Sequence, residues 1–181
     1  MHGVVRTFVA VLILSLAVVF QLQAEVRDPE EYFFHQSFGD LPEEVEIAKE
    51  EGQTSILVMF ELNDCPWCER MKEMILNQSE VQDYFRKHFR VLMMNVEGDN
   101  LIVDFDGEEI LEKDFALKHN RIRATPVFLF LDLEGSRIAR YTGAAKNIEE
   151  FMLLGEYVTD GHFETTNFVR FKRARLKSSS N

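Results

Sequence analysis

Cysteine is scarce in this sequence. Only two of the 181 residues are cysteine, and Cys65 and Cys68 are three positions apart. Such a pair cannot join distant segments, so the multi-disulfide framework of small secreted domains is excluded. A zinc site needs about four ligands, and the histidines show no matching spacing. A metal-binding or partner-binding module without catalysis therefore stays only an alternative, and we expect no metal and no cofactor.

Basic residues are also in deficit. The chain has 20 Lys and Arg against 31 Asp and Glu, a formal net charge of -11. An acidic domain of this kind is not expected to bind nucleic acid through its phosphates. The exception is a basic run from Arg170 to Lys177. We expect a solvated, frayed tail there, with contact to a membrane or an acidic partner as the alternative.

No apolar run reaches the roughly 20 residues of a comfortable membrane span. The run from Phe8 to Phe20 follows the single early charge, Arg6, and the small residue Ala24 comes shortly after it. This is the layout of a secretory signal. It predicts a periplasmic or otherwise exported protein cut near Ala24, with an uncleaved membrane anchor as the alternative.

The remaining chain alternates helical and strand patterns, which predicts a layered α/β domain. We divide it into a signal peptide (1–24), a lead-in (25–40), a domain (41–160) and a C-terminal extension with the basic tail (161–181). Ser79 followed by Gln82 resembles a capping box at the start of a helix. The expected strands are 55–60, 90–96, a short strand near 102, 127–131 and 137–141, and the expected helices begin near 42, 66, 79, 112 and 148.

The chemistry centres on Cys65-Pro66-Trp67-Cys68, where an apolar strand gives way to a helix. Residues three apart on a first helical turn share a face, so the two sulfurs can form a disulfide. Unpaired N–H groups at the helix start favour a thiolate on Cys65, which predicts that Cys65 attacks and Cys68 resolves. Trp67 offers an apolar surface for substrate contact.

Carboxylates surround this motif. Asp64 and Glu69 flank it, and Glu61 lies four residues before Cys65. Like charge opposes a thiolate and raises a thiol pKa, which favours a reductase. A disulfide oxidase or isomerase, and an inert structural disulfide, are the alternatives, because the redox potential of a cysteine pair cannot be calculated from sequence.

The motif, the preceding strand Ile56–Phe60, and Thr125-Pro126 before the apolar strand Val127–Phe130 together resemble the thioredoxin superfamily. The resemblance covers roughly residues 41–160. It implies a three-layer fold with a mixed central sheet flanked by helices. It also implies that Pro126 follows a cis bond facing the cysteines, and that Thr125 binds the substrate backbone as an added strand.

More narrowly, the chain resembles the periplasmic SoxW-type thioredoxins found with sulfur-oxidation systems. That resemblance implies a thiol reductase acting on oxidised protein thiols, such as those of sulfur-carrier or cytochrome-maturation proteins, and recharged by a membrane electron donor. One position departs from the cytosolic thioredoxin pattern, because Met59 stands where a buried aspartate is expected. Residues 59 and 61 share a strand face, so Glu61 is our candidate proton acceptor for Cys68.

Overall fold

The computed structural model describes residues 25–178, and its centre is a four-stranded sheet in the order β2-β1-β5-β6. Strand β1 (Ser55–Glu61) pairs in parallel with β2 (Phe89–Asn95) and antiparallel with β5 (Val127–Leu131). Strand β6 (Arg137–Thr142) pairs antiparallel with β5 at the sheet edge. The predicted α/β fold with a mixed central sheet is confirmed.

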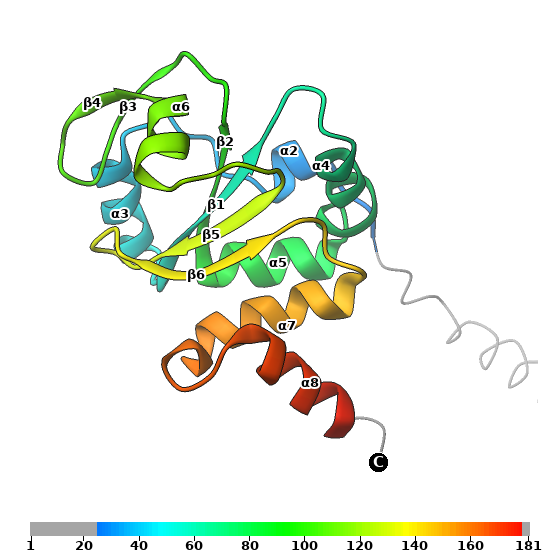
Figure 1. Ribbon diagram of the computed structural model, residues 1–181. Helices are drawn as coiled ribbons and strands as arrows, with labels where there is room; N and C mark the ends of the chain where they lie inside the picture. Colours follow the sequence, from blue (N-terminus) through cyan, green and yellow to red (C-terminus); the bar gives the residue numbers. More distant parts are fainter. Residues whose placement is uncertain (1–24, 179–181) are drawn as a thin grey trace, which may run out of the picture.

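Helices cover both faces of this sheet (Figure 1). Helices α3 (Leu41–Glu50) and α6 (Glu112–Asp114) lie on one face, and α5 (Ser79–His88) and α7 (Ile148–Thr159) lie on the other. Helix α4 (Pro66–Met71) follows β1 through a short loop. The expected three layers are therefore present.

The side chains on the two faces of β1 pack in two separate hydrophobic cores. Leu57 and Met59 pack with the helices α4, α5 and α7, whereas Ile56, Val58 and Phe60 pack on the α3 side. All five side chains are fully buried. Burial on both faces is what a continuous apolar run predicts for a central strand, and it fixes the end of β1 beside the cysteines.

Short irregular elements complete the domain. The strands β3 (Leu101–Val103) and β4 (Glu109–Leu111) form a hairpin, and Gly107 in its turn has a φ of 81°. That left-handed conformation suits glycine. Two π-helical segments extend α4 and α6, and a single 3₁₀ turn follows α7: these are Lys72–Leu76, Phe115–His119 and His162–Glu164.

The N-terminal lead-in packs on the domain. After the short helix α2 (Pro29–Tyr32), Phe33 and Phe34 are buried, and the Phe33 ring contacts the rings of Phe85 and Phe151. The predicted signal segment lies outside the described residues. Among residues 25–178, no helix combines the length and apolarity needed to cross a membrane.

The predicted capping box at α5 is wrong. The N-cap of α5 is Gln78, which makes no side-chain capping bond, and Ser79 is already inside the helix. The Ser79 N–H instead donates to the carbonyl of Glu25 in the lead-in. The Gln82 amide turns inward and donates to the carbonyls of Arg27 and Leu76. A backbone carbonyl of the lead-in thus accepts from the Ser79 N–H, which the Gln82 side chain was expected to satisfy.

The expected frayed tail is also wrong. Residues Phe168–Ser178 form a helix, α8, which packs along α7 (Figure 1). Phe171 is buried against Tyr157, and Lys172 Nζ lies 2.5 Å from Glu150 Oε1. The basic run forms a helix because aromatic residues at helical spacing dock on α7 while acidic residues of α7 pair with its cations.

Candidate active site

The two cysteines form a disulfide at the start of α4. Cys65 is the N-cap residue and Pro66 opens the helix, where its missing N–H costs no hydrogen bond. The Cα atoms are 5.2 Å apart, within the ordinary range for a disulfide. Cys65 is 6% exposed and Cys68 is fully buried. An external thiol or disulfide can therefore reach Cys65 more easily than Cys68, as an attacking and a resolving cysteine require.

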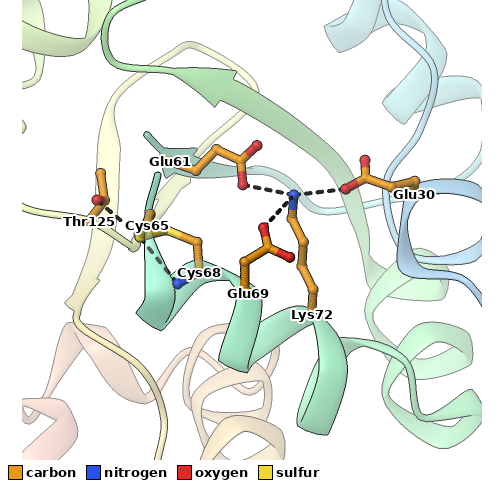
Figure 2. The surroundings of a disulfide bond; sticks show 7 residues. All are labelled: Glu30, Glu61, Cys65, Cys68, Glu69, Lys72 and Thr125. Carbon is orange, nitrogen blue, oxygen red and sulfur yellow. Dashed lines mark hydrogen bonds and ion pairs between the residues drawn. A yellow bond between two sulfur atoms is a disulfide. The ribbon is translucent and has the colours of Figure 1, made fainter. Parts of the chain in front are cut away.

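Two donors converge on the sulfur of Cys65 (Figure 2). The backbone N–H of Cys68 lies 3.1 Å from Cys65 Sγ, and the hydroxyl of Thr125 lies 3.3 Å from the same atom. A thiolate accepts hydrogen bonds better than a thiol does, so donors in this position favour the ionised form. The site is thus built to stabilise negative charge on Cys65 when the disulfide opens.

The Thr125–Pro126 peptide bond is cis, as the resemblance implied. Pro126 is buried, and its carbonyl accepts from the N–H of Gly143 at 2.8 Å. Strand β5 begins at Val127. The strand and the turn after β6 therefore hold the Thr125 side chain against Cys65.

Trp67 stands beside the disulfide with 60% of its surface exposed. It lies on the first turn of α4, between the two cysteines. An exposed tryptophan next to a reactive sulfur is an available contact surface for a bound polypeptide.

A lysine that the sequence analysis missed connects this site to the lead-in (Figure 2). Lys72 Nζ lies 2.8 Å from Glu61 Oε2 and 2.8 Å from Glu30 Oε1, and 4.0 Å from Glu69 Oε1. Burial alone would lower the pKa of Lys72, but hydrogen bonds to Glu30 and Glu61 outweigh it and raise the pKa. Lys72 follows Cys68 by four residues, so the helical spacing alone could have predicted that the two side chains lie on the same face. Glu30 gave no such signal.

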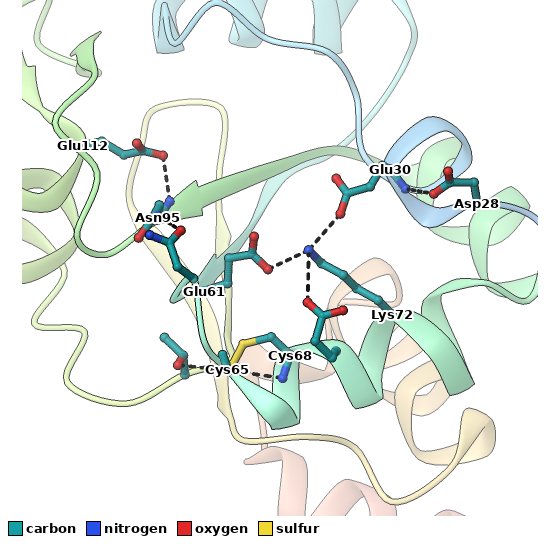
Figure 3. A network of polar contacts seen from close by, with 11 residues as sticks. Asp28, Glu30, Glu61, Cys65, Cys68, Lys72, Asn95 and Glu112 are labelled. Carbon is teal, nitrogen blue, oxygen red and sulfur yellow. Dashed lines mark hydrogen bonds and ion pairs between the residues drawn. A yellow bond between two sulfur atoms is a disulfide. The ribbon is translucent and has the colours of Figure 1, made fainter.

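A second carboxylate lies behind Glu61 (Figure 3). Glu112 accepts from the Asn95 N–H at 2.7 Å and from Asn100 Nδ2 at 3.3 Å. Burial raises the pKa of Glu112, these hydrogen bonds oppose the rise, and the nearby charge of Glu61 adds to it. Two carboxylates thus lie near the end of β1: Glu61 on the strand itself, bound to the ammonium of Lys72, and Glu112 on α6.

Met59 is fully buried in the same core as Cys68. An apolar thioether there cannot accept a proton, so the position expected for an aspartate has no such function in this chain. Glu61, two residues on, has 16% of its side chain exposed and is held by Lys72. Figure 2 shows Glu61 on the same side of the disulfide as Lys72.

The surroundings of the disulfide within the described residues include an open cavity beside α4. Within residues 25–178 no group of three or more His, Cys, Asp or Glu side chains is arranged to hold a metal ion. An open cavity of about 500 Å³ lies on the α2 side of α4, and its wall includes Glu30, Glu69 and Lys72.

Comparison with known proteins places this geometry in a family. The thioredoxin-like domain family matches residues 41–159, whereas no curated protein sequence matches significantly. Three solved structures share the fold. A thioredoxin-fold protein from Helicobacter pylori is 23% identical, with a TM-score of 0.57 over 72% of this chain and 86% of that one.

The second is a candidate disulphide isomerase from Bacteroides thetaiotaomicron, 25% identical, with a TM-score of 0.55 over 75% of this chain and 96% of that one. The third is a thioredoxin from Thermus thermophilus, 20% identical, with a TM-score of 0.52 over 75% and 88% of the two chains. The thioredoxin fold together with the Cys65–Cys68 pair suggests thiol-disulfide oxidoreductase activity. The chain belongs to the thioredoxin-like domain family.

Proposed function

We propose that this protein reduces protein disulfides by dithiol exchange, with Cys65 as nucleophile and Cys68 as resolving cysteine. The observation that carries the assignment of Cys65 as nucleophile is the pair of donors on Cys65 Sγ, the Cys68 N–H and the Thr125 hydroxyl. Both would stabilise a thiolate on the more accessible of the two sulfurs. The reductive direction rests on the neighbouring carboxylates instead.

The reaction transfers two electrons in two steps. The Cys65 thiolate attacks a substrate disulfide, which forms a mixed disulfide and releases one substrate thiolate that takes up a proton. Cys68 then loses its proton to a base, for which Glu61 is our candidate, and attacks Cys65 Sγ. The Cys65–Cys68 disulfide forms, and the second substrate sulfur leaves and is protonated. A dithiol donor must afterwards reduce the pair again.

Exposed carboxylates near the pair support the reductive direction. Asp64 and Glu69 are both exposed, and their negative charge opposes a thiolate, which makes the dithiol state a better electron donor. Glu61 contributes less to this effect than the sequence suggested, because Lys72 balances its charge at 2.8 Å.

The reduction potential tests the direction. We expect equilibration with glutathione to give a reduction potential of about -270 mV or below for the Cys65–Cys68 pair. A potential of about -120 mV would overturn the reductase proposal. Asp64→Asn removes an exposed charge without changing the side-chain size, so its pair should be slightly more oxidising. Arg173→Gln on α8 is the matched control.

Disulfide isomerisation is the second candidate, favoured by the 25% identity to the candidate isomerase from Bacteroides thetaiotaomicron. An isomerase would leave no net change in thiol content while restoring activity to a protein with scrambled disulfides. A reductase would consume one dithiol for each disulfide opened.

Export, the substrates and the electron donor belong to the proposal as well. The apolar segment before Ala24 supports an exported, periplasmic protein. The SoxW-type resemblance supports oxidised thiols of sulfur-carrier or cytochrome-maturation proteins as substrates, and a membrane thiol reductase as donor. Comparison of the mature N-terminus with Glu25 by mass spectrometry would test cleavage.

A further inference from the structure

Two stretches of this acidic chain contain no Asp or Glu at all. Residues 115–131 and 135–148 together carry six Lys and Arg, although the whole chain has 31 acidic residues. The fold brings them together, because β5 and β6 pair and Arg140 Nη1 donates to the carbonyl of Asn120 at 3.2 Å. The six cations thus outnumber the two carboxylates of the intervening turn, Asp132 and Glu134, along this edge of the sheet and the loop that leads to Pro126.

Structural roles account for only part of this charge. Arg140 joins β6 to the end of the π-helical segment, and Lys118 pairs with Asp114 at 2.8 Å. Within residues 25–178, in contrast, Arg121, Arg123 and Arg137 form no hydrogen bond or ion pair through their side chains. All three are exposed. Their charges are available to a partner.

Two of the three unpaired arginines border a hollow. An open groove of about 440 Å³ is lined by Arg121 and Arg137, with His119 and Asn120 beside them, and no carboxylate is part of its wall. Arg121 also holds a left-handed φ of 54°, a conformation that costs a non-glycine residue about 1 kcal/mol. A long cation therefore occupies a backbone position that suits glycine better.

This groove is connected to the disulfide through a short loop. Ile122 is buried and its N–H donates to the carbonyl of Ala116, which fixes the loop between the exposed Arg121 and Arg123. Arg121 lies four positions before Thr125, a distance of at most about 14 Å along an extended backbone. A peptide bound at Thr125 and Cys65 would therefore reach Arg121 within four to six residues of its cysteine.

We propose that Arg121, Arg123 and Arg137 form a subsite for the carboxylates of an acidic polypeptide substrate. The proposal rests on the proposed function only for the reason the polypeptide is bound, since binding itself can be measured without turnover. On the opposite flank, the wall of the 500 Å³ cavity carries four carboxylates against two cations, Arg27 and Lys72, so its net negative charge would repel acidic residues. Carboxylates should thus help on one side of the substrate cysteine and not on the other.

Three fluorescently labelled peptides test this on the full chain. Each has serine in place of its cysteine; one is neutral, one has glutamates four to six residues before the serine, and one has them after it. By anisotropy at low salt we expect one acidic peptide to bind about fivefold more tightly than the neutral one, as two added exposed ion pairs would allow. High salt should remove the difference.

The variants are Arg121→Gly and Arg137→Gln, with Arg173→Gln on the exposed side of α8 as the control. Arg121→Gly removes the charge and suits the left-handed backbone, so the turn should remain folded. We expect both variants to abolish the preference for the acidic peptide and the control to keep it. Equal binding of all three peptides to the unmodified protein, or an unchanged preference in both variants, would overturn the subsite. Failure to reduce any disulfide peptide would contradict the proposed function instead.

Discussion

Lys72 Nζ lies 2.8 Å from Glu61 Oε2, and the two residues bracket the disulfide: Glu61 is four residues before Cys65 and Lys72 is four after Cys68. The same ammonium binds Glu30 in the lead-in. The polar surroundings of the disulfide are therefore built from three separate segments. A substitution in one of these segments should alter the ion pairs of the other two.

Replacement of Glu61 by glutamine should slow the release of the mixed disulfide. The substitution keeps the size of the side chain and removes the carboxylate that we assign as proton acceptor for Cys68. Single-turnover reduction of a peptide disulfide, followed from pH 5 to 9, would measure this step. Glu80→Gln, at an exposed side chain in the first turn of α5, is the control. An unchanged rate over the whole pH range would exclude the role.

Replacement of Lys72 by methionine should destabilise the protein by about 1–2 kcal/mol, because it leaves the half-buried carboxylate of Glu61 without its cation. Removal of both partners, in Lys72→Met with Glu61→Gln, should recover part of this loss. Urea unfolding of the two single variants and the double variant gives the coupling energy directly. Strictly additive losses of unfolding free energy would show that the 2.8 Å contact does not contribute to stability.

Histidine 35 should make stability depend on pH. Burial lowers the pKa of His35 to about 4, helped by the charges of Arg86 and Arg90, and its Nδ1 accepts from the Val91 N–H at 2.9 Å. Below about pH 6.5 the His35 side chain is protonated in the unfolded chain but stays neutral in the folded protein. The contribution of neutral His35 is therefore complete above about pH 6.5 and is lost as the pH falls toward 4.

We expect this loss to be about 2 kcal/mol after allowance for solvent screening. His35→Asn keeps an acceptor for Val91 and removes the titration. Its unfolding free energy should vary less between pH 7 and 4 than that of the unmodified protein. Parallel curves for the two proteins would contradict the assignment.

The docking of α8 should depend on one aromatic side chain. Phe171 is 6% exposed and lies against Tyr157 and His162, so Phe171→Ala should cost about 3 kcal/mol or release the helix from α7. Hydrogen exchange of residues 168–178 distinguishes the two outcomes. Val169→Ala, at a side chain 59% exposed, should have little effect, and similar losses in both variants would contradict a specific packing role.

Much of this architecture could be predicted from the sequence because local residue patterns determine where the strands and helices form. The apolar runs that became β1 and β5 are continuous, and Pro66 marks a helix start, so their places follow from propensity and periodicity. Cys65 and Cys68 are close in space because they are close in sequence. The cis bond before Pro126 followed from resemblance rather than from a local rule.

The errors involve partners that lie far away in the sequence. The capping box at Ser79 failed because the carbonyl of Glu25 takes its N–H, and the frayed tail failed because α7 supplies an apolar surface and carboxylates for α8. The contact between Glu30 and Lys72 spans 42 residues. No periodicity encodes such a pairing, which depends on how the lead-in folds back over α4.

The most direct test of the account is a trapping experiment with Cys68→Ser. With a disulfide-bonded peptide, this variant should accumulate a mixed disulfide at Cys65, detectable by mass spectrometry as a peptide adduct that dithiothreitol removes. Cys65→Ser should accumulate none, because Cys68 is fully buried. An adduct on Cys68 in the second variant, or no adduct in either, would contradict the assignment of Cys65 as nucleophile and Cys68 as resolving cysteine.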